Sequence, residues 1–164
     1  MVTIVAPIKI VIDIQATPAD VWAIISDLRR MTEWSPEVVF QGFTSRRIRR
    51  GTRSINLNKR KGFVWPTSSK VTVFEPEKEL SFYVYGAAAQ WTYELEPTAT
   101  GTRLIERREL PGGKRAIASK LTARLALGGV ESHDAELIEG MNKTLARIKA
   151  EVESVQQDVG MSRG

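Results

Sequence analysis

The feature that most constrains the fold is a long apolar stripe near the C-terminus, between residues 130 and 155. Apolar residues recur there in steps of three and four, as on one face of an α-helix: Leu137, Met141, Leu145, Ile148, Val152 and Val155. Acidic residues precede basic ones along this segment, which suits the helix dipole. A helix of about seven turns with a single apolar face needs a broad surface to cover that face. We expect the rest of the chain to supply this surface.

The upstream segment predicts a sheet. Alternating apolar and polar residues indicate a first strand at 8–14, and six more strands are expected at 38–45, 51–59, 68–75, 79–86, 89–96 and 102–110. A proline at a helix start predicts a helix from Thr17 after the first strand, and 114–127 predicts a shorter helix before the long one. This order favours an α+β fold with a curved antiparallel sheet of about seven strands around the C-terminal helix.

Length and composition narrow the class of protein. The 164 residues fit one domain, expected to span 1–157, with a flexible tail at 158–164. The chain has no cysteine and one histidine, so we expect no metal site and no cofactor. It shows no secretory leader and no apolar run near the ~18 residues of a membrane span, which favours the cytoplasm. Sequence signatures of catalysis are absent, which favours binding over an enzymatic role.

The hairpin around Gly86–Ala89 indicates which side chains face the helix. A four-residue loop there places three pairs on the inner face: Leu80 with Leu95, Phe82 with Tyr93, and Val84 with Trp91. We predict that a ligand-binding cavity is lined by Phe82, Trp91, Tyr93, Leu104, Leu137, Met141, Thr144 and Ile148. Thr144 either contacts a ligand or donates to the carbonyl four residues earlier in its own helix.

The register after Pro97 is open by one residue. One register places Leu104 beside Tyr93 and Glu106 beside Trp91, and the other places Ile105 and Arg107 there. Both bring a charged side chain close to Trp91 on the inner face. Such a charge either marks a polar site or reaches solvent where the sheet twists. The candidates for proton transfer are therefore His133, Tyr93 and Glu106. The alternative for His133 is a solvated side chain near a helix start, with no role in chemistry.

Every charged residue from Val38 to Phe74 is basic. These cations either protect exposed strands from aggregation or attract an anionic membrane or an acidic carrier protein, through Arg46, Arg47, Arg49, Arg50, Lys59, Arg60 and Lys61. No aromatic residues are interleaved with them between Arg46 and Lys61, which argues against nucleic acid. Trp65, in the loop expected before the strand at 68–75, is a candidate cavity lid or membrane-touching tip.

Several motifs resemble those of a known family. They are Asp13 to Trp22 (DIQATPADVW), Ser26-Asp27-Leu28, Trp34-Ser35-Pro36, Glu75-Pro76, Gly101 to Leu104 and Thr144 to Lys149. Together they are similar to the START-like (SRPBCC) superfamily, and most of all to its polyketide cyclase/dehydrase and lipid-transport branch. The resemblance implies a helix-grip fold with a hydrophobic cavity between sheet and C-terminal helix. It shares no signature of catalytic residues, and the helix expected at 114–127 departs from its pattern.

Three functions follow as hypotheses. The first is binding or transport of a lipid, fatty acyl chain or polyketide-like molecule in the cavity. The second is a polyketide cyclase, aromatase or dehydratase that uses the same cavity. The third is an adaptor that docks an anionic membrane or acidic protein through the basic strands at 46–61.

Overall fold

The computed structural model of the protein describes residues 7–111 and 130–162. The elements follow in the order β1 (Ile8–Ile14), α1 (Pro18–Ile25), a 3-10 turn η1 (Leu28–Arg30), α2 (Met31–Trp34), β2 (Val38–Phe43), β3 (Arg53–Arg60), β4 (Phe63–Glu75), β5 (Glu79–Tyr85), β6 (Ala89–Thr98), β7 (Gly101–Glu109) and α4 (Val130–Met161). The helix expected at 114–127 lies outside the described residues.

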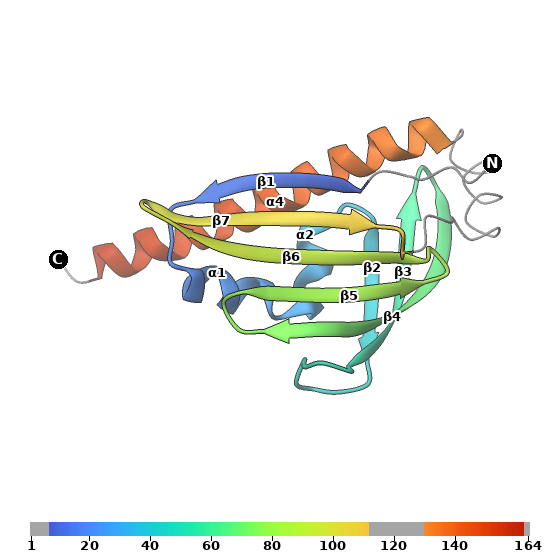
Figure 1. The fold of residues 1–164 in the computed structure, drawn as a ribbon, viewed down its shortest axis with the longest axis horizontal. Helices are drawn as coiled ribbons and strands as arrows, with labels where there is room; N and C mark the ends of the chain where they lie inside the picture. The colour runs from blue at the N-terminus through green and yellow to red at the C-terminus, as the bar shows by residue number, and fades with distance from the viewer. Residues whose placement is uncertain (1–6, 112–129, 163–164) are drawn as a thin grey trace.

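The seven strands form one antiparallel sheet, in the order β1-β7-β6-β5-β4-β3-β2. Figure 1 shows the sheet in front, with α4 crossing behind it and α1 and α2 on the same side as α4. The predicted α+β helix-grip architecture is therefore confirmed. Within the described ranges no helix is both long and apolar enough to cross a bilayer.

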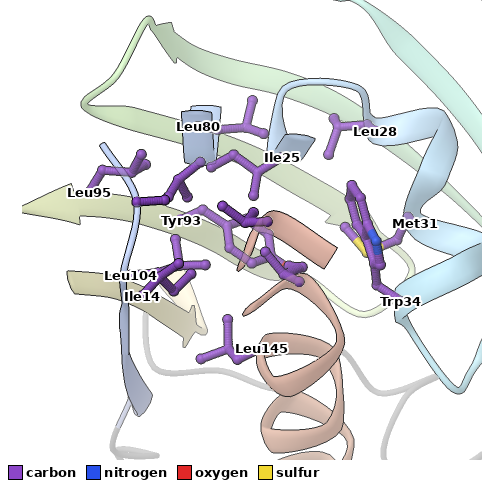
Figure 2. Packing of buried hydrophobic residues seen from close by; sticks show 14 of the residues in the cluster. Ile14, Ile25, Leu28, Met31, Trp34, Leu80, Tyr93, Leu95, Leu104 and Leu145 are labelled. Atoms are coloured by element: carbon purple, nitrogen blue, oxygen red, sulfur yellow. The ribbon is translucent and has the colours of Figure 1, made fainter. Parts of the chain in front are cut away.

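The core lies where the C-terminal helix meets the first and last strands. Figure 2 shows Ile14, Leu104 and Leu145 pointing toward one another from β1, β7 and α4. Trp34 is fully buried, and its indole nitrogen donates to Glu151 Oε2 at 3.0 Å, which ties α2 to α4. At the start of α1 the Thr17 side chain accepts a hydrogen bond from the Asp20 amide at 3.2 Å, as expected of an N-cap.

Two element boundaries differ from the expectation. Strand β4 begins at Phe63, so Trp65 is paired with Asn58 inside a strand and the expected loop there is wrong. The turn is tight because Lys61 and Gly62 both have positive φ, 48° and 80°, which suits a two-residue hairpin loop. Helix α4 runs to Met161 and so includes the first residues of the segment expected as a tail.

The register between β5 and β6 is displaced by two residues from the predicted one, and that between β6 and β7 by two residues from the first predicted register and by one from the second. Phe82 pairs with Trp91, and Trp91 pairs with Arg108 on its other side, while Tyr93 pairs with Glu106. Neither register considered after Pro97 is right. The first turn keeps four residues but lies one residue earlier in the chain, between Val84 and Ala89, and the second turn is shorter, with two residues between Thr98 and Gly101. A shift of two residues preserves which side chains face inward. Leu104 and Glu106 therefore face inward, as in the first of the two registers considered after Pro97.

Candidate functional site

A cavity of about 180 Å³ lies between the inner face of the sheet and α4. Helix α4 is fixed against β1, where Lys149 Nζ donates to the Asp13 carbonyl at 2.7 Å and the Gln15 amide donates to Glu153 Oε1 at 3.0 Å. Residues from strands β2 to β7 contribute to the lining of the cavity. A protein cavity of about 150 Å³ is large enough for benzene. This cavity therefore has room for a ring or a short chain.

One side of the cavity is apolar. Most of this lining comes from β4 to β6, α4 and the region of η1 and α2: Leu28, Met31, Val71, Phe82, Val84, Trp91, Leu137 and Met141. Six of the eight residues predicted to contact a ligand are in the lining, namely Phe82, Trp91, Tyr93, Leu137, Met141 and Thr144. The structure places the other two, Leu104 and Ile148, in the core. They lie where the helix already packs closely on the sheet.

The opposite side is polar and comes from β3 and its neighbours. Ser54, Asn56 and Asn58 are buried on the inner face of β3. They are joined to one another and to β2 and β4 by side-chain hydrogen bonds: Ser54 Oγ to Asn56 Oδ1 at 2.9 Å, Ser54 Oγ to Ser69 Oγ at 2.6 Å, Asn58 Nδ2 to Thr67 Oγ1 at 3.1 Å, and Gln41 Nε2 to Asn56 Oδ1 at 3.1 Å. Gln41 also belongs to the lining, and its buried Oε1 atom has no hydrogen-bond partner within 7–111 and 130–162.

The sequence prediction missed this polar wall. Residues 53–59 alternate strictly, and the apolar Ile55 and Leu57 would ordinarily be assigned to the inner face. The signal that could have corrected this is charge. Arg53 and Lys59 share a face with Ile55 and Leu57, so that face must be the exposed one.

Glu106 and Tyr93 form a buried pair on the cavity wall. Each side chain is only 2 % exposed, and the Tyr93 hydroxyl lies 2.9 Å from Glu106 Oε1. Burial raises the pKa of Glu106 to about 8, although the Tyr93 hydrogen bond opposes this rise. The pKa of Tyr93 is also raised, first by burial and then by the charge of Glu106 when it ionises. At neutral pH the carboxyl is therefore protonated, and the prediction that this charge reaches solvent is wrong.

The second carboxyl oxygen is the distinctive atom of the site. Glu106 Oε2 is buried and has no hydrogen-bond partner among the residues that the structure describes. Because Tyr93 donates to Oε1, the proton of the neutral acid belongs on Oε2. A buried hydroxyl without a partner costs about 1–3 kcal/mol. The lining thus contains a hydrogen-bond donor that a ligand oxygen could satisfy. Arg108, two residues along β7, lines the same cavity.

Comparison with known proteins fits this geometry. The sequence model of the family described as polyketide cyclase / dehydrase and lipid transport matches residues 6–153. The chain belongs to this family. No curated protein sequence matches it. Membership of this family supports a role in hydrophobic ligand binding or cyclisation.

Solved structures share the fold of this family member. The di-domain ARO/CYC StfQ from the steffimycin biosynthetic pathway is 13 % identical with a TM-score of 0.73; the match covers 92 % of this chain and 51 % of StfQ, so the chain spans about half of that protein. The Polyketide_cyc-like protein Cgl2372 from Corynebacterium glutamicum is 28 % identical, with a TM-score of 0.59 and coverage of 93 % and 94 %. TTHA0849 from Thermus thermophilus is 19 % identical, with a TM-score of 0.62 and coverage of 92 % and 99 %.

Two other predicted site residues of this family member lie on α4. The Thr144 hydroxyl donates to the Gly140 carbonyl at 2.9 Å, so its bond within the helix is the interpretation that the structure supports. His133 belongs to α4, but its side chain lies outside the described residues. Across 7–111 and 130–162, no group of histidine, aspartate and glutamate side chains is arranged to hold a metal ion.

The basic residues do not form one surface. Arg60 is paired with Glu37 and, at 3.1 Å, with Glu136, and Lys61 is also paired with Glu136. These ion pairs line a charged cleft that adjoins the cavity at Pro36, Glu37 and Gly140. The prediction that Arg60 and Lys61 attract an acidic partner is therefore weakened, because acidic side chains of the protein already pair with them. Lys59 is exposed on β3, whereas the remaining four basic residues are exposed in the loop between β2 and β3 rather than on strands: Arg46, Arg47, Arg49 and Arg50.

Proposed function

We propose that the protein binds an apolar small molecule that carries a hydrogen-bond-accepting oxygen, such as a polyketide-like compound or an acyl chain, in the cavity between the sheet and α4. The observation that supports this most strongly concerns Glu106, a residue of the lining, whose buried Oε2 atom has no hydrogen-bond partner in the described part of the chain. A ligand without such an oxygen would leave it unsatisfied.

Two terms contribute to the binding free energy. Apolar contact with Phe82, Trp91 and Met141 contributes about 25 cal/mol for each Å² removed from water. A hydrogen bond from Glu106 to a ligand oxygen contributes about 1 kcal/mol and selects the orientation of the ligand. The first term supplies most of the affinity, whereas the second supplies specificity.

A matched pair of probes tests this division. 1-Tetralone and tetralin share a fused ring system, but only the ketone carries an acceptor oxygen. We expect the protein to bind 1-tetralone about fivefold to tenfold more tightly, as judged by calorimetry at neutral pH. Glu106→Leu should bring the two affinities together, and Glu106→Gln, whose amide still donates, should keep part of the preference. Equal affinity of the unmodified protein for both probes would refute the role of Glu106.

A cyclase or dehydratase role is the second candidate, favoured by the same neutral carboxyl. A carboxylic acid with a pKa of about 8 can give a proton to a ketone or to a leaving hydroxyl at neutral pH. In a dehydration the proton of Glu106 would leave with the hydroxyl as water, while a second proton is lost from the adjacent carbon to solvent. The double bond forms between these two carbons.

The dehydration of 4-hydroxy-4-phenylbutan-2-one separates this role from simple binding. The enone product absorbs in the ultraviolet, so the rate is followed directly. An enzyme that uses Glu106 as its acid should lose activity above about pH 8 and on Glu106→Gln, while 1-tetralone still binds to that variant. A rate no higher than that of buffer would leave binding as the function.

A further inference from the structure

The inverted strand β3 has a second consequence on the outer face of the sheet. Because its polar residues face the cavity, its apolar residues face away from the core, and Ile55 is 65 % exposed. The register places Leu57 between Phe40 on β2 and Pro66 on β4, and Phe40 is 58 % exposed. We call this the outer apolar patch; it comprises Phe40, Ile55, Leu57, Val64 and Pro66, which are all exposed.

Cations border this patch on the same face. Arg53 pairs across the strands with Lys70, one row beyond Ile55, and Lys59 pairs with Val64 at the opposite end. On β5 the partners of Ser68 and Lys70 are Tyr85 and Tyr83, whose rings are in edge contact at 5.0 Å. The sequence contains no acidic residue from Val38 to Phe74. The outer face over β2 to β4 is therefore apolar in the middle and positive at its edges.

We propose that this face docks the protein on an anionic lipid membrane. Apolar side chains that enter the boundary between headgroups and acyl chains, flanked by cations that remain among anionic headgroups, are the arrangement by which proteins lie on such surfaces. The proposal does not depend on the ligand in the cavity, because the patch and the cavity lie on opposite faces of the same strands.

Charge favours this occupant over a second copy of the chain. Two copies packed patch to patch would bring Arg53, Lys59 and Lys70 of one against the like charges of the other, which is unfavourable. An acidic protein would satisfy these cations but would have to match the apolar centre as well. An anionic bilayer satisfies both parts with one surface.

Vesicle flotation tests the proposal with the whole chain. We expect it to float with vesicles of phosphatidylcholine and phosphatidylglycerol, but not with phosphatidylcholine alone. Lys59→Gln/Lys70→Gln should weaken partitioning about fivefold for each charge removed. Ile55→Ser/Leu57→Ser should weaken it at unchanged charge, and the folding of this variant is verified by circular dichroism. Lys9→Gln/Val11→Ser is the matched control, since it removes one exposed cation and one exposed apolar side chain from β1; it should partition like the unmodified protein.

Three results would overturn the proposal. One is the absence of flotation with phosphatidylglycerol vesicles, or flotation that the control variant weakens as much as the patch variants. Another is binding to poly-L-glutamate that matches vesicle binding and survives Ile55→Ser/Leu57→Ser, because this indicates an acidic protein partner. The third is a dimer, detected by light scattering, that Ile55→Ser/Leu57→Ser dissociates, because a second copy would then cover the patch.

Discussion

Raising the pH is expected to destabilise the protein through the single buried side chain of Glu106. Its pKa rises from 4.5 to about 8 on folding, because burial penalises the charged form. Between these two values the unfolded chain has lost this proton while the native protein keeps it. The favourable contribution is therefore complete below pH 4.5, declines as the pH rises, and is lost above about pH 8.

The size of this effect follows from the pKa difference. At about 1.4 kcal/mol for each pKa unit, a rise from 4.5 to about 8 corresponds to about 5 kcal/mol. A domain of this kind has a total unfolding free energy of about 5–15 kcal/mol, so the change is large enough to measure by urea denaturation. Glu106→Gln removes the titrating group and should flatten the dependence between about pH 5 and pH 8.

The comparison between protein and variant isolates Glu106 from its neighbours. Tyr93 and Arg108 are ionisable groups next to Glu106 on the cavity wall, and neither loses a proton in this range, since the pKa of Tyr93 is raised and arginine stays charged. Tyr93→Phe removes the bond that stabilises the carboxylate, so it should extend the decline to higher pH. Parallel pH profiles for the protein and Glu106→Gln would refute the assignment of a neutral buried acid.

Three further predictions concern the cavity and the packing that supports it. Met141→Trp should fill the cavity and abolish 1-tetralone binding while the melting temperature changes little, as measured by calorimetry and thermal denaturation. Gly101→Ala should cost about 3 kcal/mol in urea denaturation, because its Cβ would lie 2.1 Å from the Ile14 carbonyl oxygen; an unchanged midpoint would contradict this close approach. Trp34→Phe should cost about 2 kcal/mol in the same assay through loss of the bond to Glu151, with probe binding retained.

The sequence predicts best those parts of the fold in which apolar residues recur with a regular spacing. The predicted stripe is buried from Leu137 to Val152, although Val155 at its end is exposed, and the alternation of residues 8–14 does form β1. Which side chains of β5 and β6 face inward was also predictable, because that depends only on odd or even position, whereas the face of β7 stayed open between two registers that differ by one residue. Turn lengths were not, since they depend on backbone conformation at a few residues such as Lys61 and Ala88, both with positive φ. This is why the registers differ by two and why Trp65 belongs to a strand.

The candidate site was predictable only in part for the same physical reason. Tyr93 and Glu106 were singled out because a charge on an inward position is costly, but their contact with each other depends on the register. The polar wall from Ser54 to Asn58 reverses the usual assignment of apolar residues to the inner face. The strand partners Gln41, Thr67 and Ser69 make the burial of that wall favourable by bonding to it. These partners are distant in the sequence and brought together by the sheet.

Native mass spectrometry of the protein purified from its own host tests the central claim most directly. We expect the unmodified protein to retain a small, apolar and oxygen-containing molecule, and Met141→Trp to show the mass of the polypeptide alone. A bare polypeptide mass for both, together with no binding of 1-tetralone, would contradict a ligand-binding cavity between the sheet and α4.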